Sequence, residues 1–393
     1  MRRFVTVFGG VCSFVVVAVA CGSSDRTGFD PGDGGGPDTA PPSFSEGGTC
    51  QPDPAAFDIP GNGCDDDGDG IVDNTPACDD NLAVFAGADD FAKAIGLCKR
   101  ASSGGNDTAW GVISATFTTG HGATTKPPEG QHGILPAFGN VIRAREGKNL
   151  GVLSTGWARA FDDVQETRCD PASLTYCFKQ GVQMQGGQPL FGAAPAGYPK
   201  SVANCAVSDQ QFDPISLKLE IRVPKNARGF TVDFDFWSGE WPDYVCTKFN
   251  DGFLVWLKSK AFNGGNPENI AFDTQKNPVS VNNAFFDRCT VGAQTGCKGQ
   301  PPILKTSTCG GDLGELEGTG FAAPGLYCNA TLSAGGGATG WLTTSAPVSP
   351  GEIISLEFLI WDSGDPKYDS TVLLDHFRWT ETDNGMPSTV RLR

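Results

Sequence analysis

Runs of alternating apolar and polar residues constrain this chain more than any other feature. Apolar residues occupy the odd positions of residues 215–223 and the even positions of residues 230–236 and 354–360. A period of two is that of a β-strand with one face in a core and the other towards solvent. The 53 Gly and 27 Pro residues punctuate the chain as turns. We therefore predict an all-β chain, folded as an antiparallel, jelly-roll-like β-sandwich.

Composition divides the chain into further parts. Residues 81–380 hold the alternating runs and one minor helix, indicated by the helical spacing of apolar positions 91, 94, 95 and 98. Residues 50–80 are rich in Cys and Asp and are expected to form a small separate module. Residues 21–49 are rich in Gly, Pro, Ser and Asp and have too few apolar residues for a core, which predicts a disordered tether. Residues 381–393 form a short tail.

Residues 1–20 have the form of a secretory signal peptide. Two arginines precede an apolar stretch that ends in small residues, a pattern typical of a cleaved signal rather than a membrane span. Cys21 follows directly, and this arrangement resembles the bacterial lipobox, whose cysteine is acylated and becomes the mature N-terminus. Gly22 resembles the next residue of lipoproteins sorted to the outer membrane. We predict a cell-surface lipoprotein anchored to the outer membrane through Cys21; an ordinary signal peptide with a chance cysteine is the alternative.

The cysteine count supports an oxidising compartment. Of 14 cysteines, Cys12 leaves with the signal and Cys21 takes the lipid, so an even number, twelve, remains. An even number is expected of a disulfide framework in an exported protein. No two cysteines form a CxxC pair, which argues against zinc or thioredoxin-like chemistry. Several lie close in sequence, as Cys289 and Cys297 do, but the sequence does not fix the connectivity.

The charge balance excludes one class of partner. The chain has 29 basic and 45 acidic residues and a formal net charge of −16. Such a surface repels nucleic acid, so we expect no nucleic-acid partner. Acidity of this kind suits divalent cations or simple solubility.

An acidic loop carries the clearest local site. Three alternate aspartates followed by Gly70 reproduce the D-x-D-x-D-G start of a calcium loop, in which the carboxylates converge on one hard cation. A backbone carbonyl and one further carboxylate would complete the shell. The predicted calcium ligands are Asp65, Asp67, Asp69, Ile71 and Asp73.

This loop differs from an EF-hand. Pro76 stands where the last glutamate of an EF-hand would lie, so we predict a shortened loop that is closed by Cys64 and Cys78 rather than by two helices. Residues 62–73 resemble a metal-binding motif of bacterial surface proteins, NGCDDDxDGxVD. The alternative is a solvated acidic linker without a metal.

A second acidic set lies within the predicted sandwich. Three aspartates crowd into residues 362–369 directly after an alternating run, and such carboxylates repel one another unless they are protonated or neutralised by a cation. Acidic and amide side chains at another strand-to-loop junction could supply more oxygens. The alternative is that these acids cap turns. The second set of predicted metal ligands is Glu240, Asn250, Asp251, Asp362, Asp365 and Asp369.

Four segments together resemble one family. Residues 151–156, 240–253, 279–283 and 361–375 are similar to the pattern GxxLSTG, SEEYPEYVxxxFNDxFxF, VSINN and DxGDxxYDSxVFL of the choice-of-anchor L domain of bacterial surface proteins. The resemblance covers about residues 84–380. It implies a surface protein whose molecular function is poorly defined and whose means of attachment varies among relatives.

The chain departs from the family pattern at two places that bear on a site. Gly239 stands where the family has an acidic residue, so the predicted site rests on Glu240 instead. Cys246 stands where the family commonly has glycine. Additional cysteine pairs mark a heavily cross-linked subgroup.

Aromatic residues suggest carbohydrate binding as an alternative to core packing. Most of the 26 Phe residues lie on the apolar phase of strands and are assigned to the core. Tryptophan rings beside cation-bound loops could cover the apolar faces of sugars while carboxylates bind hydroxyl groups. The predicted ligand-stacking residues are Trp237, Trp241, Trp361 and Trp379.

Signals for catalysis are weak. None of the three histidines lies in H-E-x-x-H, and G-x-S-x-G is absent. The members of a Ser-His-Asp triad need not be adjacent, so a hydrolase stays a minor alternative. We predict a non-catalytic, calcium-stabilised surface protein that mediates adhesion or binds an extracellular polymer, either carbohydrate or protein. A metal-scavenging protein is the main alternative, but copper is disfavoured because copper prefers imidazole and sulfur ligands and the chain has three His and three Met.

Overall fold

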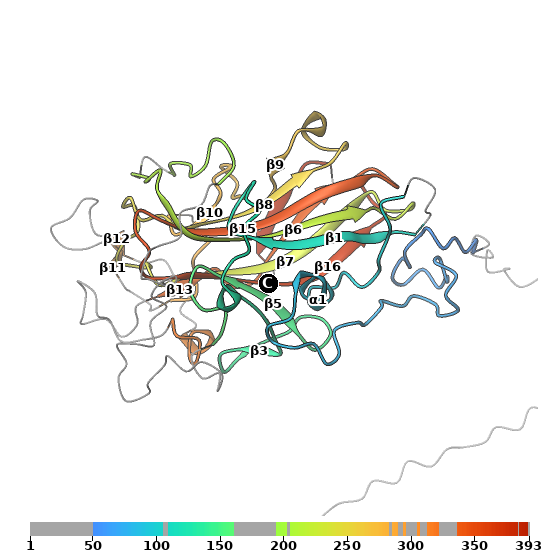
Figure 1. The fold of residues 1–393 in the computed structure, drawn as a ribbon, viewed down its shortest axis with the longest axis horizontal. Coiled ribbons are helices and arrows are strands. Elements are labelled where there is room, and N and C mark those ends of the chain that lie inside the picture. The colour runs from blue at the N-terminus through green and yellow to red at the C-terminus, as the bar shows by residue number, and fades with distance from the viewer. Residues whose placement is uncertain are drawn as a thin grey trace, which may run out of the picture. The chain divides into compact units, whose positions relative to one another are not determined.

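Two large antiparallel β-sheets face each other in the computed structural model (Figure 1). They lie within the compact unit Cys50–Arg393. The predicted signal peptide, the tether and Cys21 lie outside the described residues. The structure describes residues 50–104, 109–160, 194–202, 205–282, 285–289, 294–295, 305–306, 313–321, 336–383 and 385–391.

Each large sheet is built from strands that are distant in sequence. The first sheet has the order β1 (Gly111–Thr118), β6 (Gln211–Arg222), β15 (Ile353–Ser363), β8 (Gly252–Lys258) and β10 (Val279–Ser280), and β9 (Glu268–Asn269) also pairs with β8. The second has the order β17 (Ser388–Arg391), β14 (Leu342–Pro347), β7 (Gly229–Ser238), β16 (Ser370–Thr380), β5 (Leu150–Ser154) and β2 (His132–Leu135), and β13 (Gly337–Ala338) also pairs with β7. Two small hairpins complete the strands, namely β3 (Ala137–Phe138) with β4 (Ile142–Arg143), and β11 (Gln294–Thr295) with β12 (Lys305–Thr306).

The connectivity agrees with the predicted antiparallel sandwich. The strands β5, β6, β7 and β8 alternate between the two sheets, as do β14, β15 and β16. The neighbouring strands of both large sheets pair antiparallel. A chain that crosses between layers at successive strands is typical of Greek-key and jelly-roll topologies. The predicted all-β, antiparallel fold is therefore confirmed.

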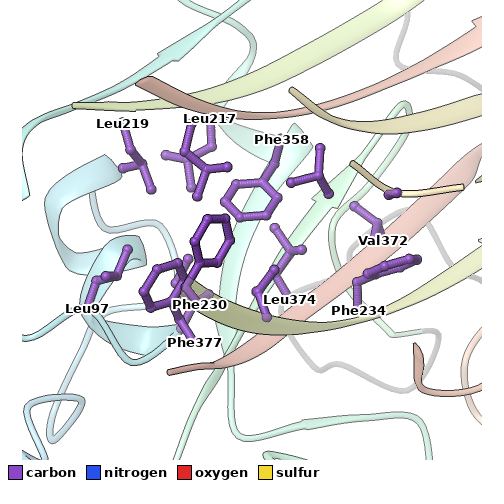
Figure 2. Close-up of a cluster of buried hydrophobic side chains, with 14 of the residues drawn as sticks. Leu97, Leu217, Leu219, Phe230, Phe234, Phe358, Val372, Leu374 and Phe377 are labelled. Carbon is purple, nitrogen blue, oxygen red and sulfur yellow. The ribbon is translucent and has the colours of Figure 1, made fainter. Parts of the chain in front are cut away.

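The core lies between the two sheets and contains the apolar phase of the predicted runs. Leu217 and Phe358 point into it from the first sheet, and Phe230 and Leu374 meet them from the second (Figure 2). Each of these four side chains is fully buried. Burial of one such side chain contributes roughly 1.5–3 kcal/mol, so these strands supply a large part of the folding free energy.

One short helix packs beside the sandwich. Helix α1 (Ala88–Ala94) buries Phe91, whose ring meets that of Phe117 on β1 edge-on with 5.4 Å between centroids. The helix ends earlier than predicted, because the helical spacing of apolar residues extended to position 98. It ends because Gly96 adopts a left-handed φ of +99°, a conformation that commonly terminates helices. Three-residue 3-10 helices occur at η1 (Glu129–Gln131), η3 (Asn263–Gly265) and η4 (Leu313–Glu315).

Residues 99–101 run along the outer edge of β1. The Val112 N–H donates to the Lys99 carbonyl at 2.9 Å, and the Ala101 N–H donates to the Val112 carbonyl at 3.1 Å. A Cβ atom on Gly111 would lie 2.1 Å from the Lys99 carbonyl oxygen, so only glycine permits this approach. The edge strand of the first sheet is thus partly covered by its own chain.

The Cys- and Asp-rich segment 50–80 packs against one part of the sandwich. Phe57 is buried with the core side chains. Its backbone N–H donates to the Asn226 side chain at 2.9 Å, and the Asn226 amide donates back to the Phe57 carbonyl at 2.8 Å. Lys225 forms an ion pair with Asp53 at 2.6 Å. The segment is therefore fixed to the loop between β6 and β7.

The outer face of the second sheet is also covered. Phe138 and Leu316 belong to a second buried cluster that includes Trp237 of β7 and Leu373 of β16. The covering side chains come from the β3–β4 hairpin and from residues 313–321. None of the helices in the described part of the chain is long and apolar enough to span a bilayer.

Candidate metal centre

Four carboxylates converge in the acidic loop. Asp58, Asp65, Asp67 and Asp69 each place one oxygen within 4.8 Å of the others. The alternate spacing predicted three of these residues, and the structure brings those three together. Asp58 was missed because it lies before the Pro60–Gly61 turn, and no local spacing rule reaches across that turn. This group can hold a metal ion.

Backbone amides fix the directions of these carboxylates. Asp65 accepts hydrogen bonds from the N–H groups of Gly68 at 2.8 Å and Gly70 at 3.0 Å. Asp58 accepts from the N–H groups of Asp66 at 2.7 Å and Asn74 at 3.1 Å. An ionised carboxylate has about four acceptor positions, so each can bind a cation while it holds the loop.

The charge in this loop is only partly balanced. The Lys99 ammonium pairs with Asp67, and it lies 5.1 Å from the centroid of the Trp110 ring. Hydrogen bonds from the Asn74 side chain and the Ile71 N–H lower the pKa of Asp69, which favours its ionised form. One ammonium among four carboxylates leaves a surplus of negative charge for a cation.

The two outer ligands of the predicted loop have other contacts. The Asp73 carboxylate accepts from the N–H groups of Asn62 at 3.0 Å and Gly63 at 3.1 Å, and Asp73 does not belong to the converging group. The Ile71 N–H donates to Asp69, and the Ile71 side chain is 60% exposed. Asp73 therefore closes the loop through backbone amides, and the Ile71 carbonyl stays a predicted ligand.

The predicted closure by Cys64 and Cys78 is wrong. Cys64 is bonded to Cys50, and Cys78 is bonded to Cys98 just after helix α1. The two cysteines therefore tie the loop to different parts of the chain, and their spacing does not reveal this because Cys64 is equally far in sequence from Cys50 and from Cys78. A backbone hydrogen bond from the Asp73 N–H to the Cys64 carbonyl at 3.3 Å joins the ends of the loop instead.

The second predicted set is buried inside the sandwich. Three of its aspartates are 0% exposed: Asp251 just before β8, Asp362 near the end of β15 and Asp369 just before β16. Asp251 accepts from the Ser363 N–H at 2.9 Å and the Ser370 hydroxyl at 2.7 Å. Neither Asp362 oxygen has a well-aligned hydrogen-bond donor among the residues that the structure describes, although the Thr155 side chain is close enough to lower the pKa of Asp362.

Burial dominates the electrostatics of these acids. It raises the pKa of Asp362, and the charges of Asp251 and Asp369 raise it further. Burial also raises the pKa of Asp251, although its hydrogen bond from Ser370 opposes the shift. Desolvation disfavours the charged form of a carboxylate, so this pair favours a protonated carboxyl over two bare charges.

The remaining predicted ligands lie around this buried pair. Burial raises the pKa of Glu240, with further contributions from Asp251 and Asp365. Asp365 is partly exposed and accepts from the Lys367 N–H at 3.0 Å. The Asn250 side chain accepts from the Asn282 N–H at 3.0 Å, so it holds a turn.

The two acidic sets differ in how closely their carboxylates meet. Within the described ranges, only the group around Asp58 brings three or more carboxylates within 4.8 Å of one another. Asp362, Asp365 and Asp369 do not meet in this way. The acidic loop is therefore the stronger candidate for a metal centre.

The four predicted stacking tryptophans are not exposed, which corrects their proposed role. Trp241 stacks on Phe286 with 4.9 Å between ring centroids, and Trp379 meets Phe377 edge-on at 5.0 Å. The outer face of β7 is covered by other segments, which a two-residue alternation does not reveal. The exposed fractions are 0% for Trp237, 1% for Trp361, 8% for Trp241 and 9% for Trp379.

One further departure from the family pattern has a structural counterpart. Cys246 has a left-handed φ of +65°, the conformation that favours glycine, and it is bonded to Cys205. Cys289 is also disulfide-bonded. The cysteines at 169, 177, 297, 309 and 328 lie outside the described residues.

Comparison with known proteins gives one match. Residues 200–377 match the family model described as Choice-of-anchor L domain. The matched range contains both Asp251 and Asp362, whereas the acidic loop and the upstream segment 151–156 lie outside it. No curated protein and no solved structure matches the chain.

Proposed function

We propose that this chain is a non-catalytic, calcium-stabilised lipoprotein of the cell surface that binds an extracellular polymer. The match of residues 200–377 to the Choice-of-anchor L domain supports the surface location. Acylated Cys21 is the proposed anchor in the outer membrane. The polymer is carbohydrate or protein of the surroundings or of a neighbouring cell. The observation that carries the calcium assignment is the convergence of Asp58, Asp65, Asp67 and Asp69.

The donor set supports calcium over copper. All four converging groups are carboxylates, and no His or Cys of the described residues joins them. Hard oxygen ligands suit calcium, whereas copper prefers imidazole, thiolate or thioether. The four aspartates would hold the ion, and the ion would supply the positive charge that Lys99 supplies only in part.

Thermal unfolding of the mature chain with calcium, and with a chelator, tests this proposal. A ligand at 100 times its dissociation constant stabilises the folded state by about 2.7 kcal/mol. We expect calcium to raise the Tm by about 5 °C, because the segment that carries the loop packs against the core. The same Tm in both buffers would contradict the calcium assignment.

A matched pair of variants locates the effect. Asp69→Asn removes one converging charge but keeps an acceptor for the Ile71 N–H, and it should abolish most of the calcium-dependent rise. Asp66→Asn changes a neighbouring aspartate outside the group and should keep that rise. Elemental analysis of protein purified from its native cell should find calcium rather than copper.

A further inference from the structure

A second feature of the molecule is a cleft of about 430 Å³ beside β8 and β9. Its lining comes from residues 198–200, from the stretch 262–276 and from Met386. Small-molecule sites in proteins have volumes of about 300–1,000 Å³ and are mostly apolar with a few polar groups. The cleft therefore has the size and lining of a ligand site.

The wall of the cleft is held by both sheets. The Thr344 hydroxyl of β14 donates to the Ile270 carbonyl at 2.7 Å, and the Phe272 N–H donates to the Thr389 hydroxyl of β17 at 3.2 Å. The Ile270 N–H donates to the Val255 carbonyl of β8 at 2.9 Å. A site on such a support keeps its geometry when a ligand enters, which lowers the entropic cost of binding.

Two ammonium groups lie against the aromatic walls. The Lys276 Nζ is 3.6 Å from the centroid of the Phe272 ring, and the Lys200 Nζ is 4.5 Å from that of Tyr198. Within the described part of the chain, neither lysine forms an ion pair with a carboxylate. Cation–π contacts place each charge at the wall, and its N–H groups have no carboxylate partner there.

The local charge opposes that of the whole chain. The net charge of the chain is −16, yet the cleft has two lysines and one acid, Glu268. Glu268 already accepts a hydrogen bond from the Tyr198 hydroxyl at 3.4 Å. Charge of one sign in a cleft with apolar walls attracts ligands of the opposite sign. An anion would therefore enter here in preference to most of the surface.

We propose that this cleft binds an anionic sugar unit, carboxylated or sulfated, of an extracellular polysaccharide. The exposed Met386 side chain would cover part of the apolar face of the sugar ring, while Lys200 and Lys276 would bind its charge and the exposed Asn263 its hydroxyl groups. This inference rests on the proposed polymer-binding function and names the chemical class of that polymer.

Binding of the full mature chain in detergent to four polymers tests the inference. The probes are hyaluronate, dextran sulfate, unmodified dextran and polyglutamate. We expect binding to hyaluronate or dextran sulfate, and these two arms distinguish a carboxylated from a sulfated unit. Binding to dextran and polyglutamate should be at least tenfold weaker.

Charge-matched variants assign the binding to the cleft. The double variant Lys200→Gln and Lys276→Gln should weaken binding at least tenfold, because two charge-assisted contacts are lost. The control, Lys126→Gln and Lys218→Gln, removes the same charge outside the cleft and should bind as the parent does.

The outcomes separate this inference from the function on which it rests. The sugar site is overturned if both double variants bind a polymer as strongly as the parent does, or if the parent binds polyglutamate as strongly as the anionic polysaccharides. Either result leaves the polymer-binding function standing. If the chain binds none of the four polymers, the inference is overturned. The polymer-binding function fails as well only if the chain also binds no other polysaccharide and no surface protein.

Discussion

The surroundings of Asp362 disfavour a bare charge. It lies wholly inside the sandwich, and neither of its oxygens has a well-aligned hydrogen-bond donor among the described residues. Leaving an ionised carboxylate in such a place costs several kcal/mol unless a proton or a cation neutralises it. Proton and cation lead to opposite effects of pH on stability.

Replacement of Asp362 by Asn distinguishes the two. Burial raises the pKa of Asp362 above its ordinary value of 3.8. A raised pKa means that the folded state keeps a proton that the unfolded state loses, so stability is full below pH 3.8 and falls as the pH rises towards the folded pKa. Asn cannot lose this proton. Urea unfolding in chelator measures the free energy of unfolding of both proteins. As the pH rises through this window, the value for Asp362→Asn minus that for the parent should increase by about 1.4 kcal/mol per pH unit.

The control is Asp209→Asn, which changes an exposed aspartate and should show no such gain. A buried cation would reverse the result for Asp362. The variant would then be less stable than the parent at neutral pH, and calcium would stabilise the parent alone.

At the scale of elements, the long strands could be predicted and their partners could not. Local alternation identified β6, β7 and β15 because side chains on one face of a strand share a period of two. The order of the sheets depends on contacts between distant residues, such as Leu217 of β6 with Phe358 of β15, which no local pattern encodes. The burial of Trp237 depends likewise on segments that are distant in sequence, including residues 313–321.

The same distinction applies to the candidate metal centre. Asp65, Asp67 and Asp69 share one loop, so their spacing was sufficient to predict that they meet. Asp58 and the disulfide partners of Cys64 and Cys78 depend on how the chain folds back, which spacing does not reveal.

The disulfide between Cys50 and Cys64 gives a prediction for this loop. Cys64 directly precedes Asp65, and the bond closes a segment with a sequence separation of 14. Cross-links of this loop length stabilise by about 3 kcal/mol, mainly by restricting the unfolded chain. The double variant Cys50→Ala and Cys64→Ala should lose about that much free energy of unfolding in chelator.

The double variant should also bind calcium more weakly, because the start of the loop is no longer fixed. Isothermal titration calorimetry measures this second effect. A calcium affinity equal to that of the parent would mean that backbone amides alone position the aspartates.

At the scale of the whole molecule, the proposed attachment to the membrane depends on a single side chain, that of Cys21. Thioether-linked lipid requires the sulfur of Cys21, so Cys21→Ser should move the protein from the membrane fraction to the soluble periplasmic fraction or the medium. Each buried CH₂ contributes roughly 0.8 kcal/mol to membrane binding, so loss of the acyl chains should release nearly all of the protein. Immunoblots of separated fractions measure this shift, and a membrane-bound variant would mean that another anchor holds the chain.

The stretch that covers the edge of β1 affects how copies of this chain associate when many of them are close together. Open strand edges template the addition of further strands, and copies held by the proposed lipid anchor would meet often because they would diffuse in two dimensions. Here residues 99–101 occupy part of the ladder that a neighbouring copy would otherwise extend. Crowded molecules should therefore not pair through this edge into fibres.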